Sequence, residues 1–129
     1  MLALLLALLR PAAAQSGWTR VAEDPRGIVF YAKAPRTSAR DRVSLDLLYD
    51  YRDAQQDPDT LLSHRSAWVA VTVDCRNRAL RMGDMRKFGE NMARGPVVER
   101  THASDVRYRE ARPDTMDDAI VRFACKRKD

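Results

Sequence analysis

Apolar and polar residues alternate most clearly in two stretches near the middle of the chain. Between Arg42 and Arg52, one face carries Val43, Leu45, Leu47, Tyr49 and Tyr51, and only Leu48 interrupts the polar face. Between Ser66 and Cys75, one face carries Ala67, Val69, Val71, Val73 and Cys75. A period of two is typical of a β-strand with one face buried. We predict two long strands that pair antiparallel through a polar loop from Asp53 to Arg65, and we expect that loop to be mobile.

Shorter segments predict four more strands. These are Trp18 to Ala22 and Ile28 to Ala32, which form a hairpin around a Pro- and Gly-containing turn, Ala79 to Phe88, and Pro96 to His102 at a sheet edge. Gly83 interrupts the third of them and indicates a bulge. Ala34 to Asp41 is polar and has no sustained period, so we interpret it as a connection with room for one helical turn.

Only the C-terminal segment has a helical period. Its apolar residues recur at the spacing of one helix face and are Met116, Ala119, Ile120, Phe123 and Ala124. Asp114 or Thr115 would be the N-cap, and Asp117 and Asp118 would lie beside the positive end of the helix dipole. The chain therefore predicts an α+β fold, an antiparallel sheet of about six strands with a C-terminal amphipathic helix. The absence of a long helix between strands excludes a βαβ topology.

Residues 1–14 resemble a secretory signal peptide. Met1 to Leu9 is continuously apolar but too short to span a bilayer, and Ala12 to Ala14 supply the small residues that precede a cleavage site. We predict cleavage after Ala14 and one mature domain over residues 15–129. The alternative is a buried N-terminal helix. No cysteine lies near the cleavage point, so a lipoprotein anchor is not supported, and we expect no transmembrane anchor.

The sequence contains two cysteines, Cys75 and Cys125. In an exported chain an even pair predicts one disulfide, which would fasten the helix to the sheet. Closing so long a loop is worth roughly 4 kcal/mol in the chain-entropy model. Removal of residues 1–14 takes Arg10 from the 23 basic residues, leaving 22 against 18 acidic ones and a formal net charge of +4. The mature chain is therefore moderately basic.

Several of these segments together resemble the surface-adhesin protein E-like family of exported proteobacterial domains. The resemblance rests on Trp18, the strand from Gly27 to Tyr31, the strand from Val43 to Tyr51, Ser66 through Cys75, and the terminal Ala124-Cys125. It implies a small antiparallel sheet with a C-terminal helix tied by a disulfide, and an adhesin that binds host extracellular-matrix and serum proteins. The late aromatic residue is Tyr108 here, where the family has Trp. No binding residue carries over by motif.

Motifs for catalysis or cofactor binding are not found. His64 and His102 are the only histidines, and neither occurs in a spacing typical of metal ligands. A Cys–His nucleophile would need Cys75 or Cys125 beside His102, but a disulfide would consume both thiols. There is no nucleophile elbow, phosphate-binding glycine loop or dinucleotide fingerprint. We expect neither an enzyme nor a cofactor.

Basic residues gather after Cys75 and predict a surface for polyanions or protein partners. The candidates are Arg76, Arg78, Arg81, Arg86, Lys87, Arg107, Tyr108 and Arg109. The simpler interpretation, which we favour, is a solvated arginine-rich surface, because acidic residues are interleaved with the bases. Export argues against nucleic acid as the partner. We expect Trp18 and Trp68 to be core aromatics rather than binding platforms.

Two functions follow from these observations. The first is an exported envelope or secreted binding module that uses the arginine-rich strands and the loop from Asp53 to Arg65 to contact a protein or an acidic glycan. The second is a periplasmic structural or assembly component that pairs an exposed sheet edge with another chain. The sequence does not name the ligand or the oligomeric state.

Overall fold

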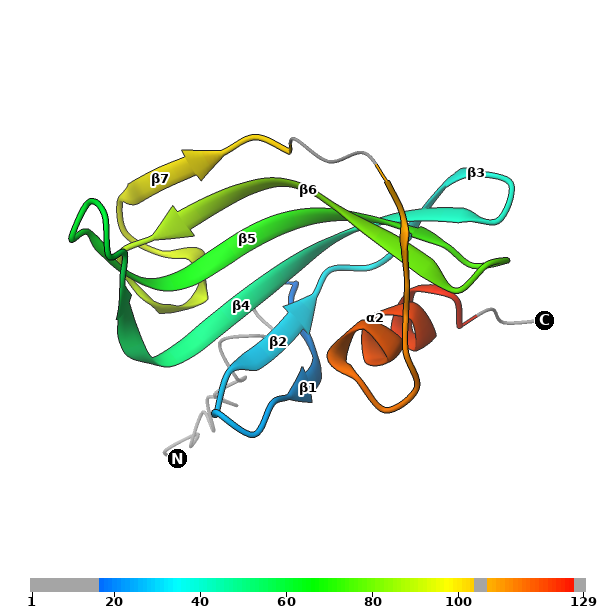
Figure 1. Cartoon of the computed structure of the whole chain (residues 1–129), viewed down its shortest axis with the longest axis horizontal. Coiled ribbons are helices and arrows are strands. Elements are labelled where there is room, and N and C mark those ends of the chain that lie inside the picture. Colours follow the sequence, from blue (N-terminus) through cyan, green and yellow to red (C-terminus); the bar gives the residue numbers. More distant parts are fainter. Residues whose placement is uncertain (1–16, 104–106, 127–129) are drawn as a thin grey trace, which may run out of the picture.

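The described residues fold into one antiparallel sheet with one α-helix on one face (Figure 1). The computed structural model describes residues 17–103 and 107–126, so the predicted signal peptide lies outside the described residues. The elements are β1 (Thr19–Glu23), β2 (Val29–Ala32), β3 (Arg36–Ala39), β4 (Arg42–Gln56), β5 (Ser63–Asp74), β6 (Ala79–Phe88), the 3₁₀-helix η1 (Asn91–Ala93), β7 (Val97–Thr101), β8 (Arg109–Glu110) and α2 (Met116–Ala124). The predicted α+β class is confirmed.

Six strands form the continuous path of the sheet, in the order β1-β2-β4-β5-β6-β7. The short strands β3 and β8 pair with β4 and β6 outside this path. In the central pair, Val43 lies opposite Val73 and Leu45 opposite Val71. Both alternating stretches therefore turn the same face toward the core, and β7 lies at an edge as predicted.

Leu48, which breaks the alternation of β4, is fully buried on the other face of the sheet. Its cross-strand neighbour is Trp68, and Trp18 packs edge-on against that indole at 5.1 Å between ring centroids. Trp18 is 4% exposed and belongs to the core as predicted, whereas Trp68 is only half-buried. A small second apolar cluster thus explains the exception.

Two predictions about connections are wrong. The loop between β4 and β5 spans residues 57–62 rather than Asp53 to Arg65, because both strands continue through their polar ends. Asp57 organises this loop, since its Oδ1 accepts the N–H groups of Asp59 (2.8 Å) and Thr60 (3.1 Å). The polar segment expected to be an irregular connection contains β3, which forms a hairpin with β4.

The bulge predicted at Gly83 is present. Val69 pairs with Met85 and Val71 with Met82, so β6 contains one more residue than β5 over this stretch. A Cβ on Gly83 would lie 3.1 Å from the carbonyl oxygen of Ala70, which is tighter than an ordinary contact. Glycine therefore allows the two backbones to approach each other here.

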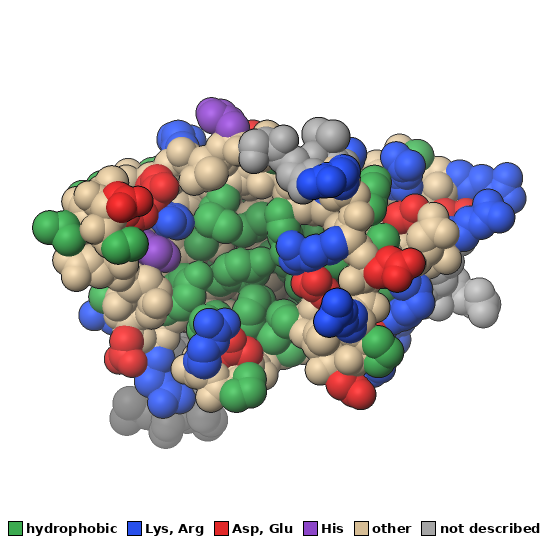
Figure 2. Space-filling view, in the orientation of Figure 1, with side chains coloured by type: hydrophobic (Ala, Val, Ile, Leu, Met, Phe, Trp, Pro, Cys, Tyr) green, Lys and Arg blue, Asp and Glu red, His purple; other side chains and the backbone are tan. Residues whose placement is uncertain are grey.

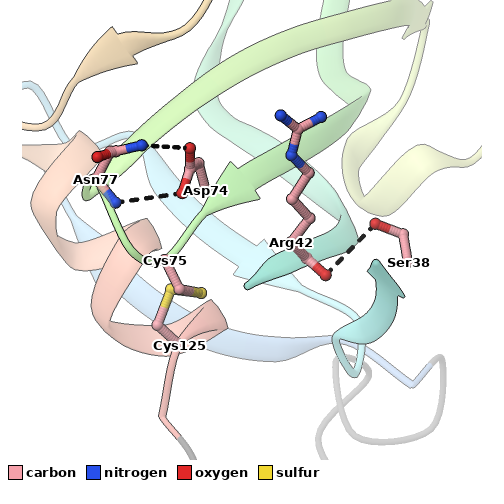
Figure 3. The surroundings of a disulfide bond; sticks show 6 residues. All are labelled: Ser38, Arg42, Asp74, Cys75, Asn77 and Cys125. Atoms are coloured by element: carbon pink, nitrogen blue, oxygen red, sulfur yellow. Dashed lines mark hydrogen bonds between the residues drawn. A yellow bond between two sulfur atoms is a disulfide. The ribbon is translucent and has the colours of Figure 1, made fainter. Parts of the chain in front are cut away.

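Helix α2 is capped by Thr115, whose hydroxyl oxygen accepts the backbone N–H of Asp118 at 3.3 Å. Ile120, Val121 and Ala124 face the sheet and complete the main core. At the end of the helix, Cys125 is bonded to Cys75, which confirms the predicted disulfide (Figure 3). The helix is thus held by packing at its centre and by a covalent bond at its end.

The sheet consequently has two unlike faces. We call the one beneath α2 the helix face. Figure 2 shows it as a hollow of hydrophobic side chains with charged residues around the rim.

The 3₁₀-helix η1 is held in place by Ser66, whose hydroxyl donates to the carbonyl oxygen of Glu90 (2.6 Å) and accepts the backbone N–H of Ala93 (2.9 Å). Among the described residues, no helix has the length and apolar composition needed to cross a membrane.

Candidate functional site

The eight residues predicted as a partner surface do not form one patch. Arg78 forms an ion pair with Asp118, and the Arg109 guanidinium donates to both carboxylate oxygens of Asp117 at 2.9 and 3.1 Å. The hydrogen bond and charge of Asp117 raise the pKa of Arg109. These two arginines therefore connect the sheet to α2.

Three more of the predicted residues lie on other elements. The Lys87 Nζ lies 3.1 Å from Glu99 Oε2, which joins β6 to β7 by an ion pair. Arg76 is exposed in the turn after β5. Arg107 is exposed at the start of the segment that leads into β8, and it lines an open cavity with Arg81, Tyr108 and Arg109.

The remaining three lie on the face opposite α2. The Arg81 guanidinium lies 5.0 Å from the Tyr108 ring centroid, and that of Arg42 lies 5.3 Å from the same centroid. Such distances are those of cation–π contacts. The Tyr108 hydroxyl is buried and has no hydrogen-bond partner among the described residues. Arg86 belongs to a second group farther along the sheet.

That second group is centred on Trp68. The Arg86 Cζ lies 4.5 Å from the Trp68 ring centroid, and the Lys33 Nζ lies 4.6 Å from it. Lys33 also lies 5.0 Å from the Trp18 ring. We call this side of the sheet the cationic face and define it by Lys33, Arg42, Trp68, Arg81, Arg86, Arg100 and Tyr108.

A cavity of about 350 Å³ opens beside Trp68 on the cationic face. Its walls come from β4, β5, β6 and β7 and from the residue after β7, and they include Asp46, Trp68, Ala70, Arg86, Arg100 and His102. Within the ranges 17–103 and 107–126, neither Arg86 nor Arg100 forms an ion pair with a carboxylate. The cavity therefore combines an aromatic ring with unpaired positive charge.

Asp84, at the bulge, also lines this cavity. Its Oδ1 accepts the N–H of Ala103 at 2.9 Å, and its Oδ2 lies 3.5 Å from His102 Nδ1. These hydrogen bonds lower the pKa of Asp84. Asp84 is thus engaged with its own loop rather than with Arg86 or Arg100.

Sequence reasoning did not include Lys33, Asp46 and Arg100 in the site. Lys33 reaches Trp68 because β2 pairs with β4, and Arg100 reaches it because β7 pairs with β6. Trp68 was predicted to be a core aromatic rather than a binding platform, but it is only half-buried. The available signal was the polar side of β5, where Trp68 is followed by Ala70 and Thr72.

Groups for catalysis do not converge in the described part of the chain. Both thiols are consumed by the disulfide, and no cluster of three metal-binding side chains occurs among residues 17–103 and 107–126. His64 is buried against the Tyr51 ring, and burial lowers its pKa. His102 is exposed and follows β7, where its Nδ1 lies 3.5 Å from Asp84 Oδ2.

The hollow of the helix face is mainly apolar (Figure 2). Next to the core, the Tyr49 hydroxyl lies 3.9 Å from the Met82 sulfur, and burial raises the pKa of Tyr49 to about 12. This surface offers hydrophobic contact but few groups that would orient a ligand. The cationic face has more charged and polar groups that would orient a ligand.

Comparison with solved structures shows that the fold has relatives. The chain is similar to Haemophilus influenzae protein E in crystal form II, with a TM-score of 0.63, 16% identity, and coverage of 85% of this chain and 87% of that one. A selenomethionine form of the same protein gives a TM-score of 0.63 at 17% identity, with 92% of each chain covered. A search of curated proteins finds no match.

The sequence comparison covers nearly all of the described chain. Residues 18–126 match the family described as surface-adhesin protein E. This range begins at Trp18 of the small aromatic cluster and ends just after Cys125 of the disulfide, so it includes every strand and the helix. The chain belongs to the surface-adhesin protein E family.

Proposed function

We propose that this protein is an exported, non-enzymatic binding module of the adhesin type, and that the cationic face holds an acidic glycan. The observation that carries the proposal is the gathering of Lys33, Arg86 and Arg100 around Trp68. None of these cations has a carboxylate partner among the described residues. Unpaired cations on a rigid sheet attract a polyanion without first having to break internal ion pairs.

An acidic glycan fits this face better than an acidic protein segment does. The half-buried indole of Trp68 offers apolar surface beside Lys33 and Arg86, and the Asp46 carboxylate can accept hydrogen bonds from hydroxyl groups. Sugars present both an apolar ring face and hydroxyl donors, whereas a glutamate-rich peptide would be repelled by Asp46. Binding of a protein in place of a glycan would appear as a failure to bind the sulfated polysaccharide.

Export is supported by the family and by the disulfide between Cys75 and Cys125, since such bonds persist in oxidising compartments. Cleavage after Ala14 remains a prediction. The location at the cell surface, rather than in the periplasm, is part of the proposal. Protease treatment of intact cells tests it, because an adhesin must be accessible from outside. Full protection of the protein would contradict the adhesin role.

The glycan proposal is tested by elution from an immobilised sulfated polysaccharide such as heparin. We expect the triple variant Lys33→Gln/Arg86→Gln/Arg100→Gln to elute at clearly lower salt than the wild type, because each lost contact reduces counterion release. The matched control is Arg76→Gln/Arg94→Gln/Arg112→Gln, which removes the same charge from exposed positions elsewhere. If the two triple variants eluted at the same salt concentration, binding would depend on net charge alone, and the proposal that the cationic face is the binding surface would be contradicted.

A second candidate function is a periplasmic assembly component that adds a strand from another chain. The favouring observation is the position of β7 at the edge of the sheet, with Val97 36% exposed. Protection from external protease, together with a partner strand cross-linked to β7 in envelope extracts, would favour this function over the adhesin.

A further inference from the structure

The cavity beside Trp68 has the dimensions of a site for a single small group. It is bordered by Ala70 on β5 and by Asp84 at the β6 bulge, and its volume is about 350 Å³. Pockets for small ligands range from about 300 to 1,000 Å³, so this one lies at the lower end. The space suits one sugar ring rather than several, and a longer glycan would continue across the cationic face outside it.

Two arginines in the cavity wall are arranged in a way that favours an anion. Arg86 on β6 and Arg100 on β7 are direct cross-strand neighbours, so their side chains lie on the same face. Like charges directly opposite one another destabilise a sheet, and no described carboxylate forms an ion pair with either one. A bound carboxylate or sulfate would accept hydrogen bonds from both guanidinium groups and relieve their repulsion.

The other walls indicate that the rest of the ligand is neutral. Asp46 and Asp84 contribute carboxylates, and Thr101 contributes a hydroxyl. A ligand that is anionic throughout, such as a polyphosphate, would be repelled by the two carboxylates. A ligand with one negative group and several hydroxyls would match both the arginines and the carboxylates, and its ring would contact the part of the half-buried Trp68 indole that Lys33 and Arg86 leave open.

We propose that this cavity is a subsite for one acidic sugar residue of the glycan. Its carboxylate or sulfate group lies between Arg86 and Arg100, its ring lies against Trp68, and its hydroxyls donate to Asp46. This inference rests on the proposed function and deepens it. It predicts selectivity for the charged sugar itself, which attraction by a polycationic surface does not provide.

The test is a titration of the wild-type protein with glucuronate, glucose 6-sulfate and glucose at constant ionic strength. Binding is followed by tryptophan fluorescence and by the indole N–H signal of Trp68 in NMR spectra. We expect saturable binding of at least one acidic sugar and binding of glucose weaker by about tenfold or more, because glucose lacks the charged hydrogen bonds. The two acidic sugars distinguish a carboxylate from a sulfate as the recognised group.

Three variants locate the binding. Arg100→Gln removes one guanidinium and should weaken binding of the acidic sugar by about tenfold. Ala70→Leu fills the cavity without a change in charge and should abolish the indole shift. Arg76→Gln, which makes the same charge change in a distant turn, should bind like the wild type.

Failure of this inference differs from failure of the proposed function. Equal binding of glucose and the acidic sugars, or wild-type binding by Ala70→Leu, would overturn the subsite. If the protein were still retained on the sulfated polysaccharide, the proposal that the cationic face binds a polyanion would remain supported. Loss of binding to both the monosaccharides and the polysaccharide would overturn both proposals.

Discussion

The arginines of this chain differ in what their guanidinium groups contact. Arg78 and Arg122 both reach the carboxylate of Asp118, which is 4% exposed and lies at the start of α2. From the sequence, the only predicted role of Asp118 was a favourable interaction with the positive end of the helix dipole. In the structure it is also the buried anion that connects the turn after β5 to the helix. Arg86 and Arg100, in contrast, have no such partner in the described part of the chain, which leaves them available to a ligand.

Asp118→Asn is expected to destabilise the protein by about 1–3 kcal/mol, because charged hydrogen bonds to a buried group are lost. The exposure of both arginines places the effect toward the lower part of that range. Urea unfolding measures it. Asp117→Asn is the control, since Asp117 is more exposed and pairs with Arg109 alone. An equal or smaller loss for Asp118→Asn would contradict the role given to Asp118.

Asp74 provides a prediction about pH. Hydrogen bonds from Asn77 lower the pKa of Asp74 from its ordinary value of 3.8 (Figure 3). The ionised carboxylate therefore favours the folded state above the ordinary pKa, and this contribution is lost as the pH falls through the lower folded value. Asn77→Ala should raise the pKa of Asp74, as followed by NMR titration of the side-chain carboxyl carbon. An unchanged pKa would show that other groups lower it.

At the scale of elements, α2 and the sheet are joined by two independent means. Ile120 and Val121 pack on the helix face, and the disulfide joins the residue after the helix to the residue after β5. The backbone N–H of Cys75 also donates to the carbonyl oxygen of Asp41 at 2.8 Å, so the anchor point on the sheet is itself fixed. The cationic face lies on the other side and shares no side chain with this attachment.

The double variant Cys75→Ser/Cys125→Ser should lose about 4 kcal/mol of stability, because the bond closes a loop with a sequence separation of 50 residues. Thermal unfolding of the variant against the oxidised wild type measures this loss. Where the variant remains folded, its elution from the sulfated polysaccharide should be unchanged. A folded variant with weakened polysaccharide binding would contradict the separation of the two faces.

Across the whole molecule, the sequence predicted what depends on local pattern. The alternation of β4 and β5, the bulge at Gly83, the cap at Thr115 and the disulfide could all be predicted because each leaves a signal within a few residues. β3 left none: its four residues are exposed and form a strand only because β4 offers a partner. The extension of β4 to Gln56 was not predicted either, because its polar last residues form a strand only by pairing with β5.

The candidate site was harder to predict because it depends on strand register. Arg86 was identified from the density of basic residues, but Lys33 and Arg100 lie far from it in sequence. They approach Trp68 only through the pairings of β2 with β4 and β6 with β7. Arg78 and Arg109 looked equivalent to Arg86 in the sequence, yet their carboxylate partners lie on α2. A charge count cannot separate arginines that hold the fold from arginines that face a ligand.

The central claim is that the cationic face is the contact surface, and NMR mapping of a bound sulfated hexasaccharide tests it most directly. We predict that, at physiological salt, the shifts concentrate on Lys33, Arg86, Arg100 and the Trp68 indole. The helix face and the loop at residues 57–62 should remain unshifted. Shifts centred on α2 or on that loop, or no shifts at saturating hexasaccharide, would contradict the account.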